Sequence, residues 1–236
     1  MAAYLRNTAE GQPDGTGLTA ANSGGGSGDP FDAVAVSGGT TSRTYSADTF
    51  AHGNQSYKLQ TATDSNTTIT ILRNVSGDVT GAISCYVYMP TYADTNCLLM
   101  SIMDTSGGTN ISTMSVNTDG TVWVSQVGSF IDISPSGTFP TSTWCRIDLV
   151  ATLGATSSTG RVKAAVTIGD SASPAWSYDS GLTASLGTTK IGSYRWGKLD
   201  NTPNIATLYM DDLSSSPGAT AFIPAPQPNT STAWIV

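Results

Sequence analysis

Apolar and polar residues alternate in short segments along most of this chain of 236 residues. A period of two is typical of strands with one buried face, and almost no stretch shows the 3.6-residue period of an amphipathic helix. The pattern predicts strands over 31–37, 56–61, 67–73, 81–89, 97–103, 111–116, 121–126, 130–133, 143–152, 161–168, 189–196 and 205–213. So many short strands predict an all-β protein with two packed antiparallel sheets.

Turn-forming residues separate these segments. Asn117–Gly120 and Thr105–Gly108 each lie between two predicted strands and have the composition of tight hairpin turns. We therefore expect neighbouring strands to pair as a meander, and two sheets of this size to close as a jelly roll. The order of the strands stays open, because alternation determines the faces of a strand and not its neighbours.

We expect a single sandwich domain over residues 1–216, since all-β domains of this length commonly have one core. Its glycine-rich stretch 11–30 predicts a flexible loop. Residues 217–236 form a proline-rich tail that ends in Trp234, Ile235 and Val236. An exposed apolar end of this kind costs solubility, so the tail either folds back on its own sandwich or docks on a neighbouring protein through these three residues.

The composition limits the partners of the protein. Charged residues make up only 11% of the chain, and the formal net charge is −7. Phosphate backbones would be repelled, because the ten Lys and Arg residues form no basic cluster in the sequence. We expect no nucleic-acid partner. We also expect no membrane segment and no export signal, because long apolar runs and a basic stretch before an apolar one are missing.

Few residues of the chain suit catalysis or covalent chemistry. Glu10 is the one glutamate and His52 the one histidine, whereas hydrolytic mechanisms need a proton donor and acceptor of suitable pKa. His52 lies in a predicted turn, which favours a structural role over a functional one. Cys85 and Cys145 share faces with apolar neighbours, and their spacing with Cys97 fits no zinc pattern, so we expect buried free thiols.

Three segments carry a family resemblance: FDAVAVSGGTTSRTYSADTFAHGNQSYKLQT, TSTWCRIDLVATLGATSSTGRVKAAVTIGD and ATLYMDDLSSS. Together they resemble the concanavalin A-like, or LamG-like, jelly-roll proteins of tailed bacteriophages, over about residues 7–216. This resemblance implies a minor tail protein or a capsid decoration protein with a capacity to bind glycans. The motifs recur in many sandwiches, so the resemblance supports the fold better than the role.

The same resemblance bears on catalysis and on metal binding. Laminarinase-type relatives carry Glu-x-Asp-x-x-Glu on one strand, and a chain with Glu10 alone has no such motif, so we expect no enzymatic activity. Related sandwiches join an acid near the N-terminus to an acid in the last strand through calcium, which makes Glu10, Asp211 and Asp212 the candidate ligands. Asp211 and Asp212 are adjacent, so we expect one to point inward and one outward. The alternative is that both simply cap a turn or face solvent.

Glycan binding would need aromatic faces beside hydrogen-bonding groups. Tyr86, Tyr88, Trp123 and Trp196 are the candidates, although aromatic residues in strands usually belong to the core or to cross-strand pairs. No set of them defines a glycan site from the sequence.

The sequence thus favours a structural component on the exterior of a tailed-phage virion, assembled in the host cytoplasm. We expect it to be a homo-oligomer that contacts capsid or tail proteins and adheres to glycan of the host cell wall. The alternatives are a dedicated carbohydrate-binding module for host attachment and a polysaccharide-degrading enzyme, which the scarcity of Glu and His disfavours.

Overall fold

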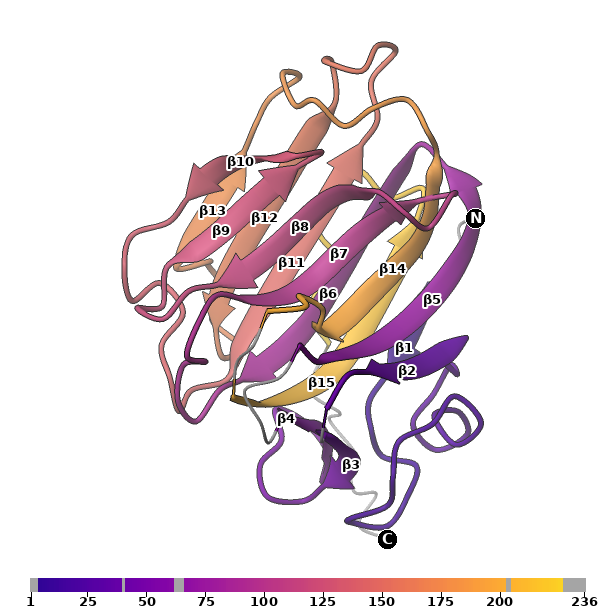
Figure 1. The fold of residues 1–236 in the computed structure, drawn as a ribbon, viewed down its shortest axis with the longest axis vertical. Helices are drawn as coiled ribbons and strands as arrows, with labels where there is room; N and C mark the ends of the chain where they lie inside the picture. Colours follow the sequence, from indigo (N-terminus) through magenta and orange to yellow (C-terminus); the bar gives the residue numbers. More distant parts are fainter. Residues whose placement is uncertain (1–3, 40, 62–65, 203–204, 227–236) are drawn as a thin grey trace, which may run out of the picture.

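The computed structural model describes residues 4–39, 41–61, 66–202 and 205–226, and it is an antiparallel β-sandwich (Figure 1). Figure 1 looks onto a seven-stranded sheet, behind which lies an eight-stranded sheet. The seven-stranded sheet has the order β10 (Ser129–Ile133), β9 (Val122–Gln126), β8 (Asn110–Val116), β7 (Cys97–Asp104), β14 (Ile191–Lys198), β5 (Thr68–Asp78) and β2 (Ala33–Ser37). The eight-stranded sheet has the order β13 (Trp176–Asp179), β12 (Arg161–Ile168), β11 (Cys145–Thr152), β6 (Thr80–Tyr88), β15 (Ala206–Pro217), β4 (Ser56–Thr61) and β3 (Thr41–Ser46), and β1 (Leu5–Asn7) pairs with β15.

Each strand predicted from alternation coincides with an observed strand, and the all-β two-sheet prediction is confirmed. Three further strands, β1, β3 and β13, had no such signal. The sequence of β3, TSRTYS, lacks apolar alternation, and β1 and β13 are only three and four residues long. These strands form because a neighbouring strand supplies hydrogen-bond partners, which is a tertiary effect.

The two predicted hairpins are present. Gly120 N donates to Asn117 O at 3.0 Å between β8 and β9, and Gly107 N donates to Asp104 O at 3.0 Å between β7 and β8. The strands β7 to β10 therefore run as the expected meander. The meander does not extend through both sheets, because β14 lies between β7 and β5, and β15 lies between β6 and β4.

The core fills the space between the sheets. Its largest fully buried side chains include Trp196, Tyr45, Tyr57 and Tyr194. Trp196, a candidate glycan aromatic from the sequence, is fully buried and therefore packs in the core. The predicted buried free thiols are confirmed for Cys85, Cys97 and Cys145. No helix in the described part of the chain has the length and apolar character needed to cross a membrane.

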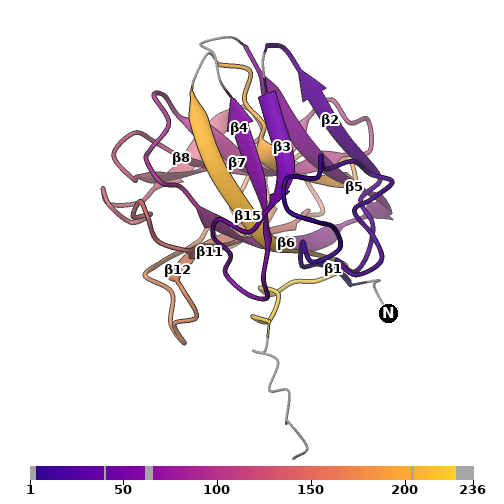
Figure 2. The same cartoon turned by 90° about the horizontal axis from the view of Figure 1, so that it is seen from below.

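The glycine-rich stretch 11–30 is hydrogen-bonded to the sandwich at several points. Figure 2 shows this N-terminal segment beside β1 and β3. The buried amide of Asn7 donates to Ser23 O at 2.6 Å and to Asp29 O at 2.8 Å. Gly28 has a φ of 109°, and a Cβ there would collide with the carbonyl oxygen of Arg6. The glycines here allow close approach of two backbones, which composition alone does not reveal.

Beyond β15, residues 218–223 lie along the outer face of the eight-stranded sheet, which is the face directed away from the other sheet. Ile223 packs against Ala82 and Val150. Lys163 Nζ donates to Thr220 O at 3.0 Å, and Arg146 Nη2 donates to Ile223 O at 2.9 Å. This part of the tail folds back on its own sandwich. Trp234, Ile235 and Val236, predicted to dock on a partner, lie outside the described residues.

Candidate functional site

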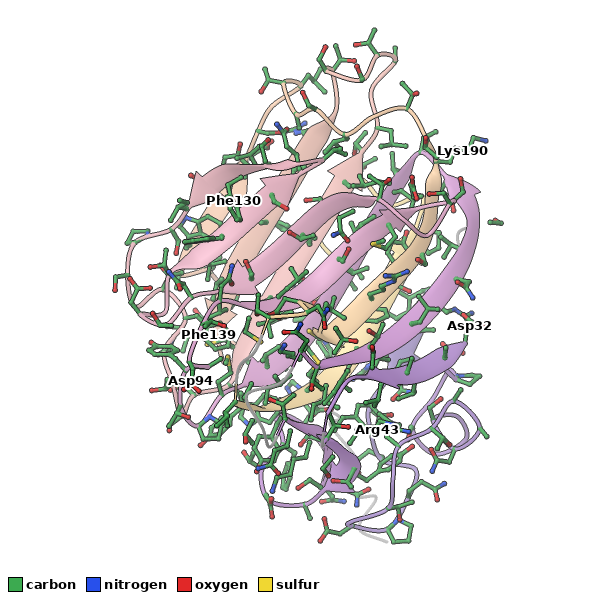
Figure 3. All side chains as sticks on the ribbon, viewed as in Figure 1. Asp32, Arg43, Asp94, Phe130, Phe139 and Lys190 are labelled. Carbon is green, nitrogen blue, oxygen red and sulfur yellow. The ribbon has the colours of Figure 1, made fainter. Side chains whose placement is uncertain are left out.

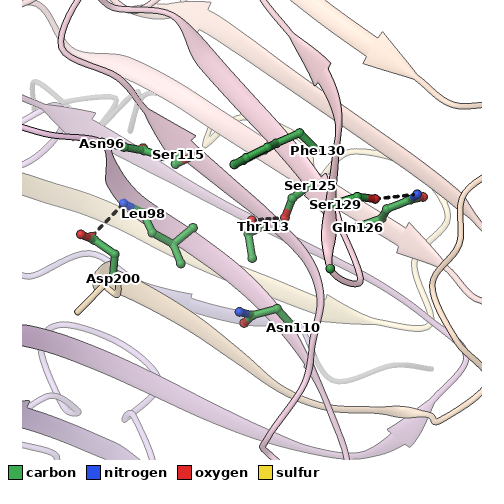
Figure 4. Close-up of a pocket in the computed structure, with 11 residues that line it drawn as sticks. Asn96, Leu98, Asn110, Thr113, Ser115, Ser125, Gln126, Ser129, Phe130 and Asp200 are labelled. Atoms are coloured by element: carbon green, nitrogen blue, oxygen red, sulfur yellow. Dashed lines mark hydrogen bonds between the residues drawn. The ribbon is translucent and has the colours of Figure 1, made fainter. Parts of the chain in front are cut away.

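A polar groove of about 350 Å³ lies on the outer face of the seven-stranded sheet, over β7 to β10 (Figure 4). Alternation along the strands creates it. On β8, Met114 and Val116 point into the core, whereas Thr113 and Ser115 point into the groove. The side chains that line it are mostly hydroxyls and amides: Asn96, Asn110, Thr113, Ser115, Ser125, Gln126 and Ser129, together with Leu98, Phe130 and Asp200.

Hydrogen bonds between neighbouring strands hold the floor of the groove. Thr113 and Ser125 are register partners on β8 and β9, and their hydroxyls are hydrogen-bonded to each other. Ser101 Oγ donates to Asn110 Oδ1 at 2.6 Å. The hydroxyl and amide groups are therefore held in place before any ligand arrives, and binding would lose less side-chain entropy.

Phe130 forms one wall of the groove. Its side chain is 56% exposed, although it lies in strand β10 rather than in a loop. Trp123 supports it edge to face, with ring centroids 4.7 Å apart at 74°. Trp123, a sequence candidate for sugar stacking, is thus the support and not part of the lining, whereas Phe130 was missed. Phe130 is exposed because it lies in the edge strand β10 (Figure 3), and the sequence pattern does not reveal which strands are at an edge.

Asp200 closes the end of the groove. Its Oδ1 accepts a hydrogen bond from Leu98 N at 3.0 Å. The neighbouring Lys198 is fully buried, and its Nζ donates to the carbonyl oxygens of Thr67, Asp200 and Thr202 at 2.7, 2.8 and 2.8 Å. No Lys, Arg or His is among the described lining residues, and the carboxylate of Asp200 is paired with Lys198 Nζ at 3.4 Å, so the lining offers no free positive charge to an anionic ligand.

A second polar site, a cluster of charged side chains, lies on the outer face of the eight-stranded sheet around Asp211 and Asp212. Asp211 Oδ2 accepts hydrogen bonds from Ala51 N and His52 N at 3.0 Å each. Asp212 Oδ2 lies 2.5 Å from His52 Nδ1, and its Oδ1 accepts from Arg6 Nη2 at 2.9 Å. Both carboxylates therefore bind residue 52 from the same side of the strand.

The expectation that the two aspartates point to opposite faces is wrong. The register with β6 shifts between Asp211 and Ser214, and Asp212 has a φ of 47°. This bulge inserts an extra residue into β15, so the alternation on which the expectation rested is interrupted. Both side chains are buried, at 0% and 2% exposure.

The three candidate calcium ligands have protein partners. Glu10 Oε1 accepts from Asn54 N at 2.8 Å and Gln55 N at 3.1 Å, so Glu10 and Asp211 bind the same loop, residues 47–55, through its backbone. This arrangement matches the alternative in which the acids cap a turn. Within the residues that the structure describes, no group of three or more His, Cys, Asp and Glu side chains is placed to hold a metal ion.

The cluster extends from His52 towards the C-terminal segment. His52 Nε2 lies 3.2 Å from both carboxylate oxygens of Asp170, and Tyr86 Oη donates to Asp170 Oδ1 at 2.7 Å. Arg146 binds Asp148 at 3.0 Å, as well as the carbonyl of Ile223. Sequence reasoning did not place Asp170, Arg146 and Asp148 in a site, because they are remote in sequence from His52 and the resemblance of segment 141–170 assigned no role to them.

Burial and charge determine the titration of this cluster. Burial, reinforced by the neighbouring charge of Asp212, raises the pKa of Asp211 to about 8. Burial also raises the pKa of Asp148, although Arg146 opposes the shift. The pKa of Asp170 is lowered, because hydrogen bonds from Tyr86 and His52 outweigh the effect of its partial burial.

Neither a protein-family model nor a curated protein matches this chain. Among solved structures, it is similar to a cellulose induced protein, Cip1, with a TM-score of 0.55 at 12% identity over 82% of this chain and 94% of that one. The fold is that of the concanavalin A-like β-sandwiches.

Two further concanavalin A-like structures agree. A protein of unknown function from Shewanella oneidensis MR-1 has a TM-score of 0.51 at 14% identity, over 92% of this chain and 88% of that one. The binding domain of botulinum neurotoxin DC has a TM-score of 0.53 at 10% identity, but this chain spans only 47% of it. The likeness confirms the predicted concanavalin A-like fold, and at these identities it shows the fold alone.

Proposed function

We propose that this concanavalin A-like sandwich is a non-catalytic glycan-binding protein, and that its ligand is a neutral polysaccharide chain bound in the groove over β7 to β10. The observation that carries the proposal is the exposed ring of Phe130 above a floor of ordered hydroxyl and amide groups. Ligand sites of this kind combine apolar surface with a few placed polar groups that set orientation.

The chemistry of a sugar suits this lining. An aromatic face covers the apolar C–H face of a sugar ring, and hydroxyls, amides and a carboxylate exchange hydrogen bonds with its hydroxyl groups. The absence of Lys, Arg and His among the described lining residues disfavours an acidic polysaccharide, because nothing in the lining would pair with its carboxylate or sulfate groups. The formal net charge of −7 acts in the same direction.

The test is binding to a panel of neutral and acidic polysaccharides, with the variant Phe130→Ala. Half-covering an aromatic side chain buries roughly 80 Å², which contributes about 2 kcal/mol, so we expect about 30-fold weaker binding. The matched control is Ile133→Ala, because Ile133 lies on the same strand and is 55% exposed but is not part of the lining. Equal affinity of the two variants, or preference for acidic chains, would refute the proposal.

We also infer that the protein is a multi-copy component on the exterior of a tailed-phage virion, where the groove adheres to host-wall glycan. This inference is supported by the sequence resemblance alone. Gold-labelled antibody on particles from the same source should mark heads or tails, and truncation after Ile223, which keeps the packed segment, should abolish incorporation. Unlabelled particles would overturn the virion role and leave the glycan proposal intact.

A further inference from the structure

His52 is held between two carboxylates on the outer face of the eight-stranded sheet. Its Nδ1 lies 2.5 Å from Asp212 Oδ2, and its Nε2 lies 3.2 Å from both oxygens of Asp170. The ring stands edge to face on Tyr86, with centroids 4.8 Å apart at 89°. Because carboxylates accept hydrogen bonds and do not donate them, both ring nitrogens must carry a proton to satisfy this geometry.

The two carboxylates differ in their surroundings. The side chain of Asp212 is 0% exposed and is also bound by Arg6, whereas that of Asp170 is 60% exposed. A neutral imidazole keeps one proton, and the buried Asp212 retains it, because an unpaired buried carboxylate costs far more than a solvated one. Deprotonation therefore leaves the lone pair of Nε2 facing the carboxylate of Asp170, which water solvates instead.

We propose that His52 is a proton-controlled clasp that joins the loop 47–55 to Asp170 of the loop 169–175 across the outer face of the eight-stranded sheet. The clasp is closed when the imidazole is doubly protonated. It opens when the ring loses the proton on Nε2. Loop 47–55 stays attached through Asp211 and Glu10, and Asp170 keeps its hydrogen bond from Tyr86 Oη. Opening therefore breaks the link between the two loops and leaves the loop 169–175 with one side-chain attachment fewer, while the strands stay paired.

The groups that face His52 come from several elements. Asp211 and Asp212 lie on β15, Asp170 in the loop after β12 and Tyr86 on β6. Arg6 on β1 binds Asp212, and Arg146 on β11 interacts with Tyr86. Burial acts to lower the pKa of His52, but the charges and hydrogen bonds of Asp212 and Asp170 outweigh it, so the pKa is raised above its ordinary value.

Because its pKa is raised in the folded protein, His52 makes the stability of the fold depend on pH. A histidine with a raised pKa in the folded state adds stability that is fully present below about pH 6.5, its ordinary pKa. That stability is lost as the pH rises through the folded pKa. Asp211 titrates in an overlapping range, so a melting curve alone would mix the two groups. A direct observation of the imidazole separates them.

The chain offers that observation, because His52 is its one histidine. Nitrogen-15 NMR of the imidazole between pH 5 and 9 should give a midpoint above 6.5, and above it the neutral ring should carry its proton on Nδ1. Hydrogen exchange of the amides 169–175, corrected for the intrinsic pH dependence, should be slower below the midpoint than above it, because the loop loses the attachment to His52 when the clasp opens.

Asp170→Asn is the deciding variant, since it changes an exposed side chain and leaves the fold intact. It should lower the midpoint and remove the pH-dependent protection of residues 169–175. Asp94→Asn is the matched control, because Asp94 is an exposed acid in the loop before β7 (Figure 3). A midpoint at or below 6.5, a neutral ring protonated on Nε2, or equal behaviour of the two variants would overturn the clasp.

Discussion

Lys198 is the buried cation that ties the end of β14 to the groove. Its side chain is 0% exposed, and its ammonium donates to the carbonyl oxygens of Thr67, Asp200 and Thr202. The carboxylate of Asp200 lies 3.4 Å away. All three protons of the ammonium thus have acceptors, which makes the burial of this charge tolerable.

Lys198→Met keeps the length of the side chain and removes its charge. Three carbonyl oxygens lose their donor. Only the bond to Thr67 O is buried, and an unsatisfied buried acceptor costs about 1–3 kcal/mol; water can replace the donor at Asp200 O and Thr202 O, which are partly exposed. The carboxylate of Asp200 also loses its cationic partner, and removing one partner of a buried ion pair costs about 3–5 kcal/mol. We therefore expect about 3–5 kcal/mol less free energy of unfolding, and a Tm lower by about 6–20 °C for a chain of this size.

The assay is equilibrium urea unfolding followed by tryptophan fluorescence, together with a thermal melt. Lys190→Met is the matched control, because Lys190 is exposed and its replacement should change the stability by about 0.5 kcal/mol or less. Asp200 lines the groove, so Lys198→Met should also weaken glycan binding. An apolar substitution of equal volume typically costs less than about 1 kcal/mol of unfolding free energy. A loss that small for Lys198→Met would refute the reasoning about the buried ammonium.

Two more predictions concern metal and thiols. EDTA should leave the Tm unchanged, because the three candidate ligands already have protein partners. Glu10 and Asp211 accept backbone hydrogen bonds, and Asp212 pairs with Arg6 and His52. A Tm that falls with EDTA and recovers with calcium would establish the calcium bridge instead. Cys85, Cys97 and Cys145 should not react with a disulfide reagent at pH 8 until urea is added, since all three are buried and burial raises the pKa of Cys145 to about 12. Rapid reaction of the folded protein would contradict this burial.

The strands and their faces could be predicted because their signal is local. A residue on β6 such as Cys85 is assigned to the core by its neighbours Ile83 and Val87, and the structure agrees. The turn Asn117–Gly120 likewise specifies its own hairpin. Strands without this signal, such as β3, form because β4 offers them hydrogen-bond partners.

The sites could not be predicted in the same way. Asp212 and His52 are separated by 160 residues, and they meet because β15 inserts between β6 and β4 and then bulges. The groove likewise joins Asp200 to residues 96–130 because β14 pairs with β7.

The sequence by itself thus determined the strands that show regular alternation and the core-facing apolar side chains on them, because alternation with a period of two acts between near neighbours. The tertiary structure alone decided which polar side chains meet, because strand order, register and bulges depend on pairing between distant segments.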